Sequence, residues 1–220
     1  MSMRFDLITI FPHIFDSYIN ESILRRAQEQ KLISVVTTDI RLFSHDRHNK
    51  VDQRPYGGGP GMVLQAEPIA RAVLSVAQKK RKPLVVITSA GGKPFDAKIA
   101  MKFSKEKQII FVAGHYEGVD ERVKKILKQE GIRVVECSIG NYVLTGGELP
   151  ALVMIDATIR HIPGVLGKEE SIEESRHGVG VPSYTRPESI LWKKKKHSVP
   201  KVLVSGNHGL IDAWRKKNKK

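Results

Sequence analysis

Apolar and polar residues follow two different spacings along the first two-thirds of the chain. Short runs of apolar or β-branched residues predict strands at 5–10, 33–40, 84–88, 109–113 and 132–137. Between them, apolar residues at helical spacing predict helices at 14–27, 67–78, 96–103, 120–129 and 149–160. Runs that are apolar throughout are typical of strands buried on both faces. The alternation of strands and helices therefore predicts an α/β fold with a parallel sheet.

Three segments depart from this alternation. The segment 45–61 is a long loop with four glycines and two prolines, and 138–147 is a second glycine-rich loop. After 162–164 the chain becomes polar, so we expect a domain at 1–167, a flexible linker at 168–182 and a short basic module at 183–220. A helix is expected in this module from about Leu210.

The charge of the chain favours a polyanionic partner. Lys and Arg number 37 against 23 Asp and Glu, which gives a formal net charge of +14. Residues 193–220 alone hold ten Lys and Arg against a single Asp. Such a surplus favours RNA, because each neutralised phosphate releases counterions. A solubilising tail is the alternative interpretation, and membrane-surface binding is less favoured because the run lacks large apolar anchors on one face.

Several classes of protein are disfavoured. The apolar stretches are far shorter than the ~20 residues that cross a bilayer, and the first residues lack a secretory signal, so we expect a cytoplasmic protein. A single cysteine, Cys137, excludes a disulfide framework, and the eight His show no metal-ligand spacing. Pro94 follows Gly92-Lys93, which excludes a P-loop, and no dinucleotide-binding glycine fingerprint is present.

Three loops follow predicted strands, at 88–94, 113–122 and 138–150. Ligands of open α/β sheets bind where the carboxyl ends of strands meet loops. Glycines in such loops let the backbone approach a ligand and expose its hydrogen-bonding groups. One such loop alone is more typical of a turn or a helix cap, but the set predicts a site that binds an adenine edge and a ribose through the main chain. The spacing does not name the ligand.

The segment 47–62 combines basic side chains, Tyr56 and a run of glycines. This composition suits a surface that meets phosphate and a stacked base. A compact loop packed on its own side chains is an equally good interpretation. Arg160 lies at the end of a predicted helix, where a contact with the helix dipole is the simplest interpretation. For the glutamates of the linker, the simplest interpretation is that they are solvated.

Several strings resemble one family, the bacterial tRNA (guanine-N1)-methyltransferases. They are G-H-Y-E-G-V-D-E-R at 114–122, S-I-G-N-Y-V-L-T-G-G-E-L at 138–149, I-P-G-V-L-G at 162–167, P-Y-G-G-G-P-G-M at 55–62 and Y-T-R-P at 184–187. A last string, at 202–215, extends the similarity to nearly the whole chain. The resemblance implies a SPOUT-type parallel sheet with a deep C-terminal trefoil knot, followed by a basic helical module that is shorter than in the family.

The resemblance also implies an activity and partners. S-adenosylmethionine would be bound in the knot, and its methyl group would be transferred to N1 of guanosine at position 37 of tRNA. The family acts as a homodimer with active sites at the interface, on tRNA and not on DNA or membranes. It uses magnesium during transfer, although no metal ligands are recognisable in this sequence.

Residue roles follow from the same resemblance. The positions that hold the methyl donor are Thr88, Ala90, Gly114, Tyr116, Glu117, Ile139, Gly140, Tyr142, Leu144, Gly146 and Gly147. The positions that engage tRNA are Asp52, Tyr56, Gly58, Gly59, Gly61, Arg186 and Arg215. Glu174 matches the general base, with Glu173 as the alternative, and Arg160 matches the arginine near the target base.

The chain departs from the family pattern at Gln53, Ala90, His115, Asn141 and Gly180. These departures and the short module make a non-catalytic RNA-binding protein the alternative from another class. Retention of all three donor loops argues against it. A SPOUT methyltransferase acting on ribose hydroxyls or ribosomal RNA is a second alternative, which the Y-T-R-P string and the glycine-rich loop disfavour.

Overall fold

The structure is a computed structural model that describes residues 2–167 and 180–219. The chain divides into two compact units, residues 1–167 and 168–220, and each is described by itself. The predicted linker 168–182 lies mostly outside the described residues, as do Glu173 and Glu174.

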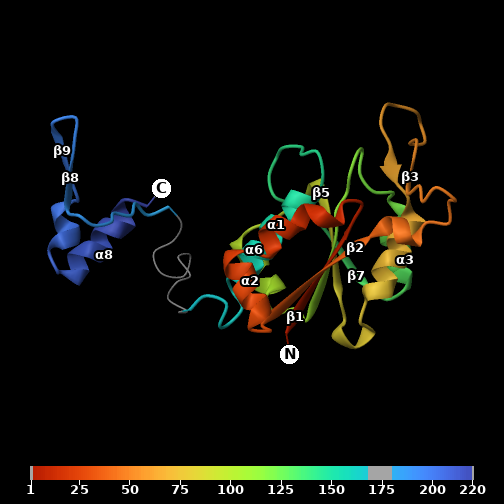
Figure 1. Cartoon of the computed structure of the whole chain (residues 1–220), viewed down its shortest axis with the longest axis horizontal. Helices are drawn as coiled ribbons and strands as arrows, with labels where there is room; N and C mark the ends of the chain where they lie inside the picture. Colours follow the sequence, from red (N-terminus) through yellow and green to blue (C-terminus); the bar gives the residue numbers. More distant parts are fainter. Residues whose placement is uncertain (1, 168–179, 220) are drawn as a thin grey trace. The chain divides into compact units, whose positions relative to one another are not determined.

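The first unit is built on a five-stranded sheet (Figure 1). In spatial order its strands are β2 (Ile33–Asp39), β1 (Met3–Thr9), β6 (Gln108–Val112), β5 (Leu84–Pro94) and β7 (Arg133–Ser138). Every neighbouring pair is parallel. The α/β class with a parallel sheet, predicted from the apolar runs, is thereby confirmed. The deep knot stays a prediction.

Six α-helices accompany these strands. They are α1 (Asp16–Ile19), α2 (Ser22–Glu29), α3 (Ala66–Val76), α4 (Ala97–Phe103), α5 (Arg122–Gln129) and α6 (Glu148–Ile159). The single helix predicted at 14–27 is wrong. The segment forms the 3-10 turn η1 (Pro12–Phe15), α1 and α2. The break between α1 and α2 lies at Glu21, which is extended (φ −125°, ψ 157°), and at Ser22, which has a positive φ of 48°. Further 3-10 turns are η2 (Ile40–Phe43) and η3 (Lys79–Arg81).

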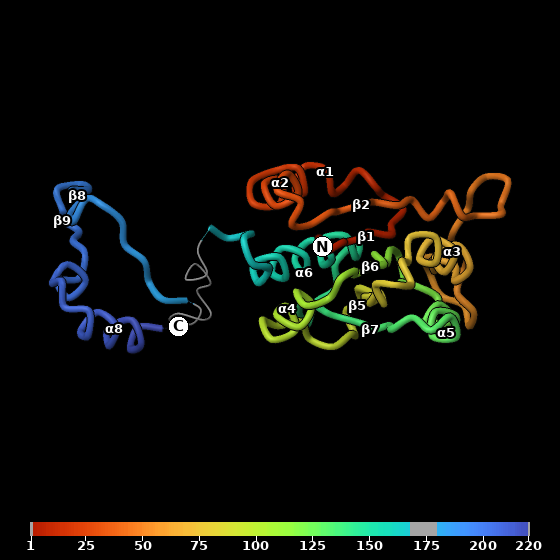
Figure 2. The backbone as a smooth tube through the Cα atoms, turned by 90° about the horizontal axis from the view of Figure 1, so that it is seen from below, coloured from red at the N-terminus to blue at the C-terminus, as the bar shows by residue number. Residues whose placement is uncertain are grey.

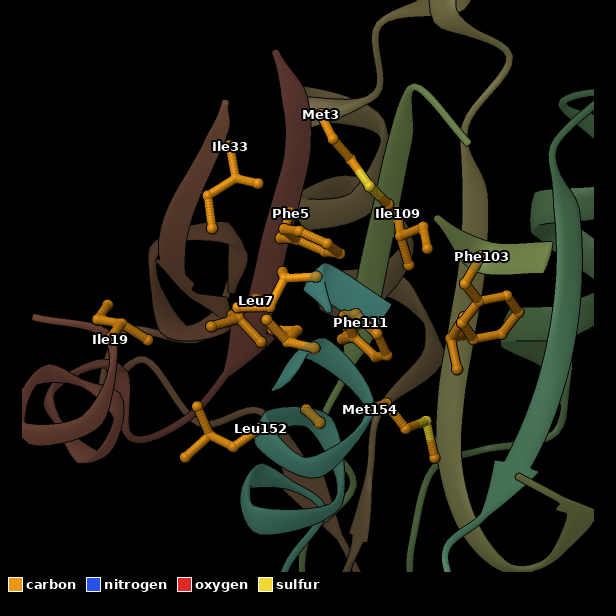
Figure 3. Close-up of a cluster of buried hydrophobic side chains, with 14 of the residues drawn as sticks. Met3, Phe5, Leu7, Ile19, Ile33, Phe103, Ile109, Phe111, Leu152 and Met154 are labelled. Atoms are coloured by element: carbon orange, nitrogen blue, oxygen red, sulfur yellow. The ribbon is translucent and has the colours of Figure 1, made fainter. Parts of the chain in front are cut away.

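Successive strand residues supply two separate cores, because side chains of a strand alternate between the faces of the sheet. Phe5 and Phe111 point to the core shared with α2, α4 and α6, where their ring centroids lie 6.4 Å apart (Figure 3). Ile8 and Val112 point to the core shared with α3 and α5. Figure 2 shows these two groups of helices on the two sides of the strands. The central strands are therefore mostly apolar, and the buried polar pair that they contain, Asp6 and Gln108, is joined by a 2.7 Å hydrogen bond.

The long loop between β2 and α3 is anchored at its base. The short strands β3 (Asp52–Gln53) and β4 (Val63–Leu64) pair antiparallel there. Leu64 also exchanges main-chain hydrogen bonds of 3.0 Å with Gly118 and Asp120. The loop is thus attached to the segment that follows β6.

The second unit combines a hairpin with helical turns. Its elements are β8 (Ser189–Trp192), β9 (Lys195–Ser198), η5 (Lys201–Val204) and α8 (His208–Lys217). The helix predicted from about Leu210 begins two residues earlier, where the Asn207 side chain caps it by accepting a 3.1 Å hydrogen bond from the Leu210 amide. The hairpin was not predicted.

Candidate active site at the carboxyl ends of the strands

Three loops at the carboxyl ends of β5, β6 and β7 surround one cavity of about 310 Å³. This volume is at the lower end of the range for small-molecule sites. All eleven residues predicted to hold the methyl donor line it: Thr88, Ala90, Gly114, Tyr116, Glu117, Ile139, Gly140, Tyr142, Leu144, Gly146 and Gly147. The fold therefore brings together positions that are up to 59 residues apart, from Thr88 to Gly147.

The first loop is a bulge within a strand. The sequence predicts a loop at 88–94, but β5 continues to Pro94 and pairs again with β7 after a register shift between Thr88 and Lys93. The bulged residues form one wall of the cavity. A Cβ on Gly92 would lie 2.7 Å from the backbone of Cys137, so only glycine lets the bulge rest against β7.

The third loop is held against the second by main-chain contacts. The Gly147 amide donates a 2.7 Å hydrogen bond to the Gly114 carbonyl. A Cβ on Gly147 would lie 2.7 Å from the Gly114 nitrogen and would overlap the Thr88 hydroxyl. Thr88 itself donates to the Val112 carbonyl at 3.2 Å. Close approach of bare backbone therefore gives the site its shape.

The glycine-rich loop meets the rim of the cavity. The Glu117 amide donates to the Met62 carbonyl at 3.0 Å, and a Cβ on Gly61 would lie 2.7 Å from the Glu117 Cγ. At the tip, Gly57, Gly58 and Gly59 have positive φ, and Tyr56 is 98 % exposed. An exposed tip favours a surface open to a partner over a loop packed on its own side chains.

A buried carboxylate beside the cavity escaped the sequence analysis. Glu148, the first residue of α6, is 3 % exposed and accepts a 2.9 Å hydrogen bond from the Thr9 hydroxyl. Its other oxygen lies 3.9 Å from Nδ1 of His115, a buried atom that has no hydrogen-bond partner among the described residues. The helix N-terminus favours a negative charge at this position. In the sequence Glu148 is the last residue of the T-G-G-E string at 145–148, and the string alone does not indicate that its carboxylate is buried.

The single cysteine also lines the cavity. Burial raises the pKa of the Cys137 thiol, and the positive charge of Lys93 opposes this only in part. The thiol is therefore protonated near neutral pH and is a poor nucleophile. This environment disfavours covalent catalysis through Cys137.

Of the predicted catalytic pair, only Arg160 lies among the described residues, and it does not lie at this cavity within one protomer. Arg160 is the C-cap of α6, whereas the cavity lies at the opposite end of that helix. Twelve helical residues rise about 18 Å. Glu174 and its alternative Glu173 lie outside the described residues.

The predicted RNA-binding residues are divided between the two units. Asp52 lies in β3 and the glycines lie in the loop that follows it. Arg186 and Arg215 line a groove of about 1100 Å³ within the second unit. In the described part of the chain, no group of three or more His, Cys, Asp or Glu is arranged to hold a metal. No helix within 2–167 and 180–219 is long and apolar enough to span a membrane.

Comparison with known proteins finds similarity over nearly the whole chain. The family model described as tRNA (Guanine-1)-methyltransferase TrmD matches residues 3–220. The chain is 45% identical over 218 residues to a tRNA (guanine-N(1)-)-methyltransferase of Geobacter metallireducens, covering 98% of this chain and 85% of the relative. Proteins of the same name from Staphylococcus carnosus and Persephonella marina are 45% and 46% identical, with 99% and 97% of this chain and 86% and 82% of the relatives covered.

Proposed function

The chain belongs to the tRNA (guanine-1)-methyltransferase family, whose enzymes methylate N1 of guanine in tRNA with S-adenosylmethionine as donor, and we propose that its target is the guanosine at position 37, beside the anticodon. The observation that carries this proposal is the convergence of all eleven predicted donor positions on one cavity. The exposed glycine-rich loop at its rim provides a surface where RNA can approach.

The residues around the cavity fit the methyl donor. S-adenosylmethionine supplies an electrophilic methyl group on a positively charged sulfonium. Glu117 adds a negative charge to the lining, which favours a cation, whereas Glu121 and Glu136, which also line the cavity, both pair with Lys124. Glycines at 114, 140 and 146 line the cavity without side chains beyond the backbone, so an adenine edge and a ribose can approach the main chain there. Hydrogen bonds to that backbone select shape and polarity without a charged side chain.

The chemistry assigns roles to the two predicted catalytic residues. Guanine N1 carries a proton, so it becomes a nucleophile only when that proton is removed. In our proposal the Glu174 carboxylate takes the proton from N1, a step of general base catalysis that typically contributes about 10²–10⁴-fold. Negative charge then develops on O6, where the Arg160 guanidinium stabilises it. The loops contribute by holding the reacting atoms in line.

The distance between Arg160 and the cavity supports a homodimer. Leu149 and Val153, four residues apart on α6, share one exposed face of that helix. The neighbouring Tyr18 is also exposed and its hydroxyl donates to Asp156 of α6. Exposed apolar patches of this kind mark protein interfaces. We propose that a second copy covers this face and that Arg160 of each protomer serves the cavity of its partner.

Mixed dimers test this exchange. Heterodimers of an Arg160→Ala protomer with a Gly147→Ala protomer should regain methyl transfer, because one cavity then combines an intact lining with an intact arginine. Each homodimer alone should be inactive. Heterodimers that stay inactive would place Arg160 and the donor in the same protomer.

The proposal also covers where the reaction takes place and whether magnesium takes part in it. We place the reaction in the cytoplasm, where a tRNA substrate would be met. Magnesium is implied by the family resemblance, but the residues described at 2–167 and 180–219 offer no three-ligand cluster for it, and no step above passes through a metal.

The direct test is incubation with labelled donor and tRNA transcripts. Label should enter transcripts with guanosine at position 37 and should be absent from those with adenosine there. Nuclease digestion should place the methyl group on N1. Equal labelling of both transcripts would exclude position 37 as the target.

A substitution separates the proposed base from the donor site. Glu174→Gln should leave the calorimetric affinity for S-adenosylmethionine unchanged and slow single-turnover transfer by about 10²-fold or more, because the amide cannot accept the proton. Glu173→Gln serves as the matched control and should retain most of the rate. The reverse pattern would assign the base to Glu173.

A further inference from the structure

The β8–β9 hairpin exposes apolar side chains that nothing in the described part of its unit covers. Leu191 is 74 % and Trp192 is 67 % exposed, and Ile190 is exposed as well. The two strands form a separate two-stranded sheet. Such a hairpin is only marginally stable in water without further packing. Exposed aromatic and aliphatic residues on it therefore indicate a binding surface.

The register of the hairpin sorts its side chains onto two faces. Trp192 pairs with Lys195 and Ile190 pairs with His197, and these four residues share one face. Leu191 and its partner Lys196 lie on the other face. Paired residues have Cβ atoms about 5 Å apart. The side chains of Trp192 and Lys195 therefore leave the hairpin side by side on one face.

The turn of the hairpin carries charge at a conformational cost. Lys193 and Lys194 connect the strands with φ values of 47° and 64°. Two-residue turns with positive φ at both positions favour Asn-Gly, because most other side chains are strained there. Lysines do not favour the backbone conformation of this turn. Their presence at both positions is therefore better explained by a function of their positive charge.

Charge and aromatic character together select the partner. Residues 189–198 contain four lysines and no acidic residue. Bases stack on exposed aromatic rings while lysines contact the adjacent phosphates in proteins that bind unpaired RNA. We propose that the β8–β9 hairpin is an RNA-contacting element in which Trp192 stacks on an unpaired base of tRNA and Lys195 contacts a neighbouring phosphate. The proposal rests on tRNA being the substrate.

The base of the hairpin is continuous with the predicted RNA surface of this unit. The Val199 amide donates a 2.9 Å hydrogen bond to the Glu188 carbonyl, which extends the pairing toward the groove. Glu188 and Val199 both line that groove, together with Arg186 and Arg215. RNA bound along the groove would therefore have the hairpin within reach.

Tryptophan fluorescence tests the stacking directly. Trp192 and Trp214 are the two tryptophans of the chain, so Trp214→Phe leaves Trp192 as the reporter. A tRNA transcript should quench this emission strongly, and a fully paired RNA duplex of equal charge should quench it weakly. Trp214→Phe removes a ring that packs near Tyr184, so it could disturb the unit. The emission of Trp192 is therefore also obtained with Trp214 in place, as the difference in quenching between the wild type and Trp192→Phe.

Substitutions test the energetic role. Trp192→Ala should weaken tRNA binding about tenfold, and Trp192→Phe should restore most of it. Leu191→Ala, which removes an equally exposed apolar side chain from the opposite face, should change the Kd less than twofold. S-adenosylmethionine affinity should be unchanged in all three variants.

The outcomes separate this inference from the proposed function. Normal methyl transfer and an unchanged Kd for tRNA in Trp192→Ala would overturn the stacking role and leave the enzyme activity intact. Quenching by tRNA without methyl transfer by the wild type would support the hairpin and contradict the activity. Emission that responds to anionic phosphatidylserine vesicles and not to tRNA would overturn the proposal in favour of a lipid surface.

Discussion

The cavity at the carboxyl ends of the strands and the C-terminal hairpin would bind their proposed ligands by opposite means. The cavity is shaped by close main-chain contacts, such as the 2.7 Å hydrogen bond from Gly147 to Gly114. The hairpin presents long side chains, and its lysines are exposed. A backbone site is fixed by packing and is insensitive to salt, whereas a lysine surface acts through screened charge. The cavity should therefore lose affinity when an added side chain fills its space, and the hairpin should lose affinity when its lysines are neutralised.

The largest effect is expected from a single methyl group in the cavity. Gly147 has an ordinary φ of −86°, so it is required for space and not for conformation. In Gly147→Ala the added Cβ would overlap the Thr88 hydroxyl and push the third loop away from Gly114. Calorimetry should then detect no binding of S-adenosylmethionine.

The matched control is Gly167→Ala, whose Cβ would have nothing within 4 Å. It should bind the donor normally and keep the Tm. Donor affinity close to that of the wild type in Gly147→Ala would show that the loops yield, and would contradict a rigid backbone site.

The same difference explains what the sequence could predict. The apolar runs predicted the parallel sheet correctly, because strands buried on both faces are mostly apolar. The bulge after Thr88 was read as a loop, since a run of glycines is compatible with both. The contact between His115 and Glu148 joins residues 33 apart in the chain, which no local pattern encodes.

Resemblance and local pattern also differ in what they predict. The motif strings predict donor positions that the fold places around one cavity. They also predict Arg160 near the target base, and in the structure a full helix separates Arg160 from that cavity within one protomer. The hairpin escaped prediction because Lys193-Lys194 carries none of the turn residues that normally mark such a connection.

A smaller effect is expected at the buried carboxylate. In Thr9→Val the buried Glu148 oxygen would lose its 2.9 Å hydrogen bond, and the Phe11 amide would lose the hydroxyl that accepts from it at 2.9 Å. Loss of one partner of a buried polar group costs about 1–3 kcal/mol in the free energy of unfolding. Urea denaturation should show this loss, with donor affinity reduced because Glu148 adjoins Gly147. Thr38→Val, in β2, is the control at a half-buried position, and equal losses in both would deny Glu148 a special role.

Charge removal from the second unit should act on tRNA alone. Replacing Lys216 and Lys217 by Gln should lower the magnitude of the slope of log K against log salt by about 1.5, if both contact phosphate. Donor binding should not change. The same exchange at the exposed Lys102 and Lys105 of the first unit is the charge-matched control. An identical drop in both double variants would mean that net charge, and not the C-terminal surface, governs binding.

The smallest effect belongs to a side-chain contact at the rim of the cavity. The Asp120 carboxylate accepts hydrogen bonds from the Arg122 guanidinium at 2.6 Å and from the Arg122 amide at 2.9 Å. These bonds hold the pKa of Asp120 below its usual value. Because the folded-state pKa is lowered, the stabilisation is present above the unfolded pKa of about 3.9 and is lost as pH falls through the folded value. Asp120→Asn should therefore lower the Tm slightly at pH 7, by less than Thr9→Val does, and the difference between the two chains should vanish as pH falls through the folded-state pKa of Asp120. A Tm difference between the two chains that persists in acid would show that Asp120 acts through the geometry at the start of α5 and not through its charge. The rim would then resemble the cavity in depending on main-chain geometry.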